Sequence, residues 1–108
     1  MIVAVDFDGT LCVSDYPKIG NPNMELIEEL KKRQLGGDQL ILWTCRAEHF
    51  LDEAVEWCKN HGLHFDAVND NVPQTVEEWG HNSRKITADL YIDDRSEKPW
   101  NILLEKAV

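Results

Sequence analysis

The chain has 108 residues, of which 43% are hydrophobic and 29% charged, and its formal net charge at pH 7 is -9. This length fits one domain with its own hydrophobic core, so we expect residues 1–108 to form a single domain, and the composition excludes a disordered or fibrous chain. The negative charge disfavours unaided binding to nucleic acid or to an anionic membrane surface, although it leaves room for a local cationic pocket.

The cysteines and the start of the chain indicate where the protein resides. Cys12, Cys45 and Cys58 leave an odd one in any pairing and lack the spacing of metal ligands, which favours small core side chains in a reducing compartment. The apolar run from Ile2 has no basic leader and is too short for a signal peptide or a membrane span. We therefore expect a cytoplasmic protein with no membrane association.

The first third of the chain predicts a strand followed by a helix. Ile2 to Phe7 is apolar, β-branched and without alternation, which is typical of a strand covered on both faces. Residues 9–21 are expected to form turns. Asn21 and Pro22 then predict the N-cap and first position of a helix, which Gly36 ends. The residues expected on its buried face are Leu26, Ile27 and Leu30.

Strands and helices alternate along the rest of the chain. The expected elements are a strand at Gln39 to Thr44, a helix at 47–61, a short strand at Phe65 to Val68, a helical turn near Val76 to Trp79, a strand at Asp89 to Asp93 and a weaker strand at Asn101 to Leu104. This order predicts an α/β fold, a three-layer, Rossmann-like parallel sheet with right-handed crossovers. Residues 69–88 are long enough to cross to the far side of the first strand. Ligands bind such sheets at the carboxyl ends of the strands, beside the point where the strand order reverses.

Polar side chains follow the predicted strands at this edge. They are Asp6 and Asp8 after the first strand, Thr44 at the end of the second, Lys85 before the fourth, and Asp93 and Asp94 at its end. Four carboxylates in one place would repel each other unless a cation neutralised them, and a site made only of oxygen ligands is typical of Mg²⁺. The sequence therefore predicts a magnesium site.

Spacing and residue type add to this prediction. Asp6 and Asp8 are two residues apart, so in a regular strand both side chains would face the same side. Gly9 permits a tight bend directly after them. Thr44 offers a hydroxyl donor and Lys85 a point charge, and both kinds of group bind phosphoryl oxygens.

In this order, the motifs Asp6-Phe7-Asp8-Gly9-Thr10, Thr44, Lys85 and Asp93-Asp94 resemble the four motifs of the haloacid dehalogenase (HAD) superfamily of phosphatases. The resemblance covers nearly the whole chain. The first motif is highly specific, whereas Thr44 or Lys85 alone would be a weak signal. The chain length and the stretch from Tyr91 to Arg95 are similar to small, capless members of the superfamily.

The resemblance implies a Mg²⁺-dependent phosphomonoester hydrolase with a HAD-like core. Asp6 would attack phosphorus and form an aspartyl-phosphate, and Asp8 would act as general acid and then general base. The implied metal ligands are Asp6, the backbone carbonyl of Asp8, and Asp93 or Asp94. Thr44 and Lys85 would hold the phosphoryl oxygens.

The chain departs from many members of this superfamily in having no room for a cap domain. Residues 9–21, which include Tyr16, and the Trp79 loop are the candidate lids, so we expect an open site. An open site admits a small phosphorylated molecule or a macromolecular end. A polynucleotide end stays conceivable despite the net charge, and homo-oligomerisation is left open.

Several residues allow two interpretations. Thr44 could cap the following helix instead of binding phosphate, and both roles can coexist. Arg46 is predicted to contact phosphate, with a solvated helix start as the equally weighted alternative. The four tryptophans, Trp43, Trp57, Trp79 and Trp100, are expected mainly in the core, with Trp79 as the one candidate for another role.

Two other functions compete with hydrolysis. A phospho-receiver domain also gathers acids, Thr and Lys around Mg²⁺, and its acceptor would be Asp66 or Asp70, near the third strand. Asp8 argues against that function, because a general acid promotes turnover whereas a receiver stores its phosphoryl group. The last alternative is an inactive module that binds metal and phosphate, which the complete motif set disfavours.

Overall fold

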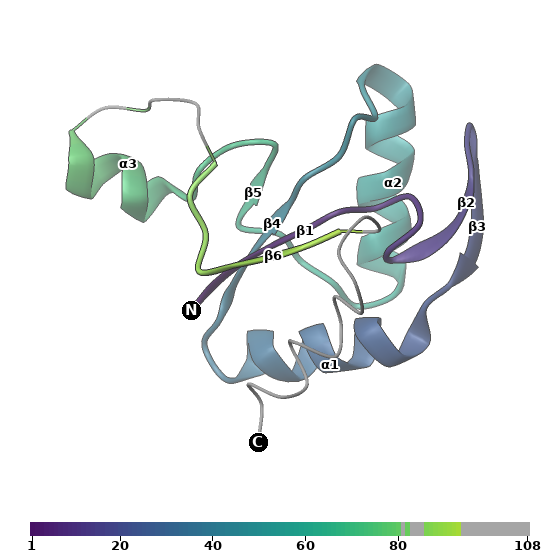
Figure 1. The fold of residues 1–108 in the computed structure, drawn as a ribbon, viewed down its shortest axis with the longest axis horizontal. Helices are drawn as coiled ribbons and strands as arrows, with labels where there is room; N and C mark the ends of the chain where they lie inside the picture. The colour runs from purple at the N-terminus through teal and green to yellow at the C-terminus, as the bar shows by residue number, and fades with distance from the viewer. Residues whose placement is uncertain (81, 83–85, 94–108) are drawn as a thin grey trace.

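The computed structural model describes residues 1–80, 82 and 86–93. Its strands are β1 (Ile2–Val5), β2 (Cys12–Asp15), β3 (Lys18–Pro22), β4 (Gln39–Leu42), β5 (Ala67–Val68) and β6 (Leu90–Ile92), and its helices are α1 (Met24–Leu35), α2 (Glu48–Asn60) and α3 (Pro73–Trp79). Figure 1 shows the four strands of the main sheet together, with the small hairpin of β2 and β3 to one side near α2.

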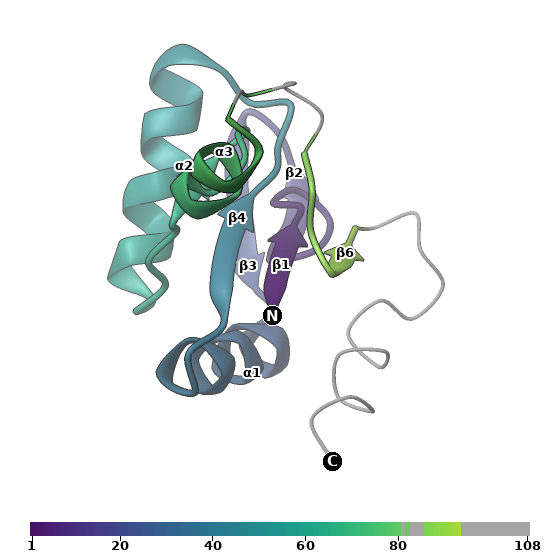
Figure 2. The ribbon, with the colours of Figure 1, turned by 90° about the vertical axis from the view of Figure 1, so that its left-hand side faces the viewer.

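The main sheet is parallel and has the strand order β5-β4-β1-β6. β1 pairs with β4 on one side and with β6 on the other, with Val5 in register with both Leu42 and Ile92. Figure 2 shows β6 on the far side of β1 from β4. The predicted crossover to the far side of the first strand is therefore confirmed, as is the α/β, Rossmann-like fold. The strand order reverses at β1, so Asp6 follows the strand at this switch point.

The two faces of the sheet pack against different parts of the chain. Val3 and Val5 belong to the larger core cluster, which α1 and α2 complete. The helix residues that contribute to it are Leu26, Ile27, Leu30, Ala54 and Cys58. Ala4 and Ile41 point to the opposite face, where they pack with Val72 at the start of α3. This alternation explains why β1 reads as a continuous apolar run, because both of its faces are covered.

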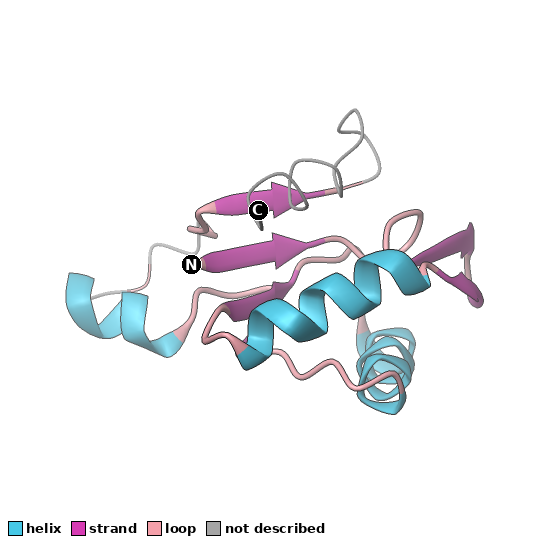
Figure 3. Cartoon of the chain, turned by 90° about the horizontal axis from the view of Figure 1, so that it is seen from below, coloured by secondary structure: helices cyan, strands magenta, loops and turns pink. Residues whose placement is uncertain are grey.

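The turn-like prediction for residues 9–21 is wrong, because most of this stretch forms the antiparallel hairpin of β2 and β3. Nearly all of its side chains are partly or fully exposed, so no apolar alternation marked it in the sequence. Gly20 permits the pairing, since a Cβ at that position would clash with the Val13 carbonyl. In Figure 3 the hairpin lies beyond the tips of the parallel strands, at the edge where the site is predicted.

The start of α1 is also corrected. Pro22 ends β3, paired with Cys12, and the N-cap is Asn23, whose side chain accepts a hydrogen bond from the Leu26 N–H. Both Asn21 and Asn23 are residues that favour the N-cap position of a helix. Because Pro22 pairs with Cys12 in the hairpin, the helix cannot begin before Asn23. The predicted buried face and the end at Gly36 are confirmed.

Other boundaries differ by a few residues. β4 ends at Leu42 rather than at Thr44, β5 is shorter than expected, and α3 is a two-turn helix instead of a single turn. Trp43 is 42% exposed, which corrects its expected place in the core, and Trp79, the one candidate for another role, is 47% exposed. The predicted strand at residues 101–104 lies outside the described residues. No helix in the described part of the chain is both long and apolar enough to cross a membrane.

Candidate functional site

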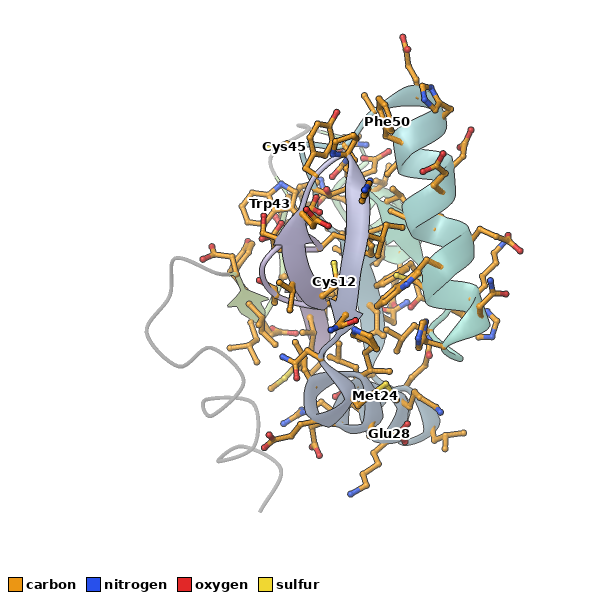
Figure 4. All side chains as sticks on the ribbon, turned by 90° about the vertical axis from the view of Figure 1, so that its right-hand side faces the viewer. Cys12, Met24, Glu28, Trp43, Cys45 and Phe50 are labelled. Atoms are coloured by element: carbon orange, nitrogen blue, oxygen red, sulfur yellow. The ribbon has the colours of Figure 1, made fainter. Side chains whose placement is uncertain are left out.

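The backbone ladder of the sheet brings Asp6 and Asp93 together. The Asp6 N–H donates to the Ile92 carbonyl at 2.8 Å, and the Trp43 N–H donates to the Val5 carbonyl at 2.9 Å, so the pairing continues one residue past the strand ends. Asp6 therefore stands opposite Asp93 on one side and Trp43 on the other. Both acids are half-buried. Figure 4 views the molecule from the hairpin side, with Cys12 on the hairpin and Trp43 and Cys45 above it in the view.

A tight turn after β1 carries Asp8 away from the ladder. The Phe7 carbonyl accepts hydrogen bonds from the N–H groups of Thr10, Leu11 and Cys12, and Gly9 has a φ of +82°. β1 ends at Val5, so the alternation of a regular strand does not govern Asp8. The prediction that Asp6 and Asp8 face the same side rested on that alternation and does not apply.

Asp8 forms a bidentate ion pair with Arg46. The Nε and Nη2 atoms of Arg46 each donate to one carboxylate oxygen of Asp8, both at 2.8 Å. The Arg46 side chain is 1% exposed and that of Asp8 is 22% exposed. Two parallel charge-assisted hydrogen bonds in partial burial fix the plane and the position of the carboxylate.

The same guanidinium group also holds the tip of the hairpin. Nη1 donates to the Pro17 carbonyl at 3.1 Å and Nη2 donates to the Lys18 carbonyl at 2.9 Å. The group lies over the Phe7 ring at 5.1 Å and over the Tyr16 ring at 5.0 Å. The hydrogen bonds to Asp8 raise the pKa of Arg46 above its ordinary value. Arg46 is therefore not the solvated helix start that was one of its two interpretations, and its predicted contact with phosphate stays a prediction.

Thr44 lies in the loop after β4. Its Oγ1 accepts a hydrogen bond from the Arg46 N–H at 3.1 Å, which leaves the hydroxyl proton to donate. The alternative role as a cap of α2 is wrong, because the N-cap of that helix is Ala47 and no side chain caps it.

Asn69 and Thr10 belong to the site, although sequence analysis gave them no role. The Asn69 Oδ1 accepts from the Thr44 N–H at 2.8 Å, and Asn69 has a φ of +51°, a conformation that Asn tolerates better than most residues. The buried Thr10 hydroxyl donates to Asp6 at 3.4 Å, a long hydrogen bond. Thr10 had a signal in its place within the first motif, whereas nothing in the sequence connects Asn69 with Thr44.

The predicted magnesium site is only partly within the described residues, since Asp94 and the phosphate-binding candidate Lys85 lie outside them. Across residues 1–80, 82 and 86–93 no three His, Cys, Asp or Glu side chains are close enough together to hold a metal ion. Asp8 is turned to Arg46, so Asp6 and Asp93 are the pair that remains. Two carboxylates still fit Mg²⁺, which usually takes one or two of them with water and phosphate oxygens.

The two residues nominated as receiver acceptors have other partners. Asp66 precedes β5 and accepts from the Leu40 N–H at 2.8 Å, so it lies at the amino end of its strand, away from the edge of Asp6. Asp70 follows β5 and accepts from the Asn82 side chain at 2.7 Å and from the Asn71 N–H at 2.8 Å. Only Asp70 is on the carboxyl side of β5.

A shallow groove of about 610 Å³ lies between β3 and α2. Its lining residues are Ile19, Asp52, Glu53, Glu56, Trp57 and Asn60. None of the predicted site residues lines it, and its rim is acidic, so it does not extend the site at Asp6.

Comparison with known proteins gives a relative for the whole chain. A solved structure of a conserved protein from Bacteroides thetaiotaomicron is 44% identical in sequence and superposes with a TM-score of 0.84, over 99% of this chain and 88% of the Bacteroides chain. The chain belongs to the same family as that protein. No family model matches the sequence, and no curated protein matches it.

Proposed function

We propose that the protein is a Mg²⁺-dependent phosphomonoester hydrolase of the haloacid dehalogenase type. The observation that carries the proposal is the position of Asp6. It follows the strand at the switch point of the sheet, with Asp93 in register on one side and the Thr44 loop on the other. A carboxylate nucleophile, an acidic metal ligand and a hydroxyl donor for phosphate are the groups that phosphoryl transfer through an aspartate requires.

The reaction has two steps. A carboxylate oxygen of Asp6 forms a bond to phosphorus while the bond to the leaving oxygen breaks, and Asp8 gives its proton to that oxygen. Water then attacks the aspartyl-phosphate, Asp8 takes the proton of this water, and cleavage of the bond between Asp6 and phosphorus releases phosphate. Asp8 keeps lone pairs for this proton, because Arg46 occupies one position on each of its oxygens.

The remaining residues would bind and orient the phosphoryl group. Thr44 offers its hydroxyl proton, and Mg²⁺ would be held by Asp6, by the backbone carbonyl of Asp8 and by Asp93 or Asp94. The ion, when bound, neutralises charge on the phosphoryl oxygens. By its resemblance to the superfamily motif, Lys85 would be the cationic ligand of the phosphoryl oxygens.

The substrate class follows from the open edge. The segment between Asp8 and α1 forms only a short hairpin, which is too small to enclose a substrate as a cap domain does. Both a small phosphorylated molecule and a macromolecular end phosphate fit such a site, and the net charge of -9 favours the former over a polynucleotide. Cytoplasmic location and homo-oligomerisation remain predictions.

The receiver hypothesis has less support than hydrolysis. Asp66 lies at the wrong end of its strand for an acceptor. Asp70 accepts hydrogen bonds at Oδ1 from the Asn71 N–H and the Asn82 side chain, which tie it to the loop after β5. By contrast, Asp6 has a second acid, Asp8, two residues away, and a nearby acid promotes turnover of a phosphoryl group.

Release of phosphate from 4-nitrophenyl phosphate tests the proposal. We expect release with Mg²⁺, loss of release with excess EDTA, and recovery when Mg²⁺ is restored. Asp6→Asn should be inactive, whereas Asp52→Asn, which changes an exposed acid on α2, should match the wild type. Equal activity of Asp6→Asn and the wild type would refute the assignment.

A further inference from the structure

Arg46 connects two parts of the chain that share no other ion pair among the described residues. One part is the turn after β1, through the bidentate pair with Asp8. The other is the tip of the β2–β3 hairpin, through the carbonyls of Pro17 and Lys18. The position of the Asp8 carboxylate and the position of the hairpin therefore depend on the same guanidinium group.

The hydrogen-bonding capacity of Arg46 is nearly exhausted by these contacts. A guanidinium group has five N–H donors, and four of the five have acceptors in Asp8, Pro17 and Lys18. Its side chain is 1% exposed, and its guanidinium group contacts the rings of Phe7 and Tyr16. Tyr16 itself contacts Phe50 of α2, with ring centroids 5.5 Å apart, so the hairpin tip also rests on that helix. Little of the group is left to receive a phosphate.

We propose that Arg46 is a positioning residue, which couples the hairpin to Asp8 and orients the general acid toward the leaving-group oxygen. This inference rests on the proposed function, because it takes Asp8 as the general acid. It replaces the role of a phosphate ligand for Arg46. The hairpin tip then helps to set the geometry of acid catalysis, because its displacement would remove two of the four hydrogen bonds that orient the guanidinium group.

The proton that Asp8 donates gives this role a specific kinetic signature. As the bond from phosphorus to the leaving oxygen breaks, that oxygen takes the electron pair and then the proton. A weakly basic leaving group such as 4-nitrophenolate needs little help, whereas a strongly basic alkoxide needs the proton for cleavage to occur. A misplaced general acid therefore slows alkyl esters more than aryl esters, and loss of a phosphate ligand slows both to the same extent.

Arg46→Lys tests the proposal with a substitution that keeps the positive charge. A lysine offers a point charge and cannot form the planar two-point contact with Asp8. We expect KM to stay within about threefold of the wild type on both esters, and kcat on an alkyl phosphate to fall at least ~10-fold further than kcat on 4-nitrophenyl phosphate. Arg33→Lys, on α1, is the matched control and should leave the ratio of the two kcat values unchanged.

A second measurement, the rate of trypsin cleavage at the hairpin tip, tests the contact between Arg46 and the hairpin and does not depend on catalysis. Lys18 lies at the hairpin tip, and Arg46 holds its carbonyl, so trypsin should cut after Lys18 slowly in the wild type. In Arg46→Lys we expect cleavage at this bond to become several-fold faster, whereas Arg33→Lys should be cut there at the wild-type rate.

The outcomes separate this inference from the proposed function. Equal losses on both esters with a raised KM would make Arg46 a phosphate ligand and overturn the coupling. Unchanged cleavage after Lys18 would overturn the link to the hairpin. A wild type that hydrolyses neither ester would defeat the proposed function, and the trypsin measurement would still decide whether Arg46 holds the hairpin.

Discussion

Asp6 and Asp8 are two residues apart, yet the fold holds them in different ways. Asp6 is fixed by backbone hydrogen bonds, between Asp93 and the chain that follows β4. Asp8 is fixed by a side chain 38 residues away in the sequence, which also holds the hairpin. The backbone ladder tolerates a change of side chain, whereas the ion pair does not. We therefore expect a substitution at Asp6 to lower activity and leave stability nearly unchanged. A substitution that breaks the ion pair between Asp8 and Arg46 should lower stability.

Asp6→Asn should break catalysis and leave the fold intact. Removal of the nucleophile should lower phosphate release by roughly 10⁴-fold or more, because the first covalent step is lost. The free energy of unfolding should change by less than about 1 kcal/mol, since the ladder uses the backbone N–H of Asp6, the hydrogen bond from Thr10 is long, and asparagine keeps an acceptor oxygen for it. Steady-state kinetics and urea denaturation measure the two effects on the same protein.

A large loss of stability in Asp6→Asn would show that its carboxylate, and not the backbone, fixes the end of β1. Asp15→Asn on the exposed hairpin is the control for a change of charge alone. It should alter neither quantity.

Arg46→Ala should produce the opposite pattern and destabilise the protein. It leaves Asp8 without its cation and removes the donor to two backbone carbonyls, which we expect to cost about 2–4 kcal/mol, the lower part of that range reflecting partial exposure of Asp8. Chemical denaturation of Arg46→Ala, Asp8→Asn and the double variant completes a thermodynamic cycle. The coupling free energy should exceed about 1 kcal/mol. Additive effects would mean that the ion pair contributes nothing to stability.

The same contrast explains what the sequence could predict. Continuous apolar runs and their turn signals predicted the parallel sheet, the crossover to the far side of β1 and the acids at its carboxyl edge, because these features follow from local pattern and strand order. The hairpin was missed because its side chains are mostly exposed and impose no apolar periodicity. The partner of Asp8 was missed because an ion pair between distant residues has no local signature.

The free energy of unfolding should fall at alkaline pH because the Cys58 thiol is buried in the core. The stability comparisons above therefore apply below pH 9. Burial raises the pKa of Cys58 to about 12, from an ordinary value of 9.0. Between these values the unfolded chain loses a proton that the folded protein keeps, so stability should be full below pH 9 and fall above it by up to about 1.4 kcal/mol per pH unit. Urea denaturation from pH 8 to 11 measures this slope.

Cys58→Ala is the control for the alkaline response. The lost sulfur lowers stability at every pH, so the comparison is between slopes and not between absolute values. The variant should show a shallower decline above pH 9. An unchanged slope would assign the response to other groups.

Substitutions at Asn69 should have a smaller effect on stability than Arg46→Ala, and the effect should depend on the side chain introduced. Asn69→Ala should cost about 1–2 kcal/mol, because it removes the acceptor of the Thr44 N–H and places alanine at a positive φ. Asn69→Gly loses the same acceptor but tolerates the backbone conformation, so it should be the more stable variant of the two. Thermal unfolding ranks them. Equal stability would show that the backbone at Asn69 is not strained.

Both Asn69 variants should also weaken phosphate binding modestly, since the Thr44 loop loses an anchor. Inhibition by inorganic phosphate measures this effect. An unchanged inhibition constant in both variants would show that the position of the Thr44 loop does not affect phosphate binding.

The most direct test of the account is the location of the phosphoryl group during turnover. Asp8→Asn should slow hydrolysis of the intermediate, because the general base for water is lost. After a rapid acid quench of this variant with 4-nitrophenyl phosphate and Mg²⁺, mass spectrometry of the peptides should find one phosphoryl group on Asp6. A phosphoryl group on Asp70, or turnover with none on Asp6, would contradict the account.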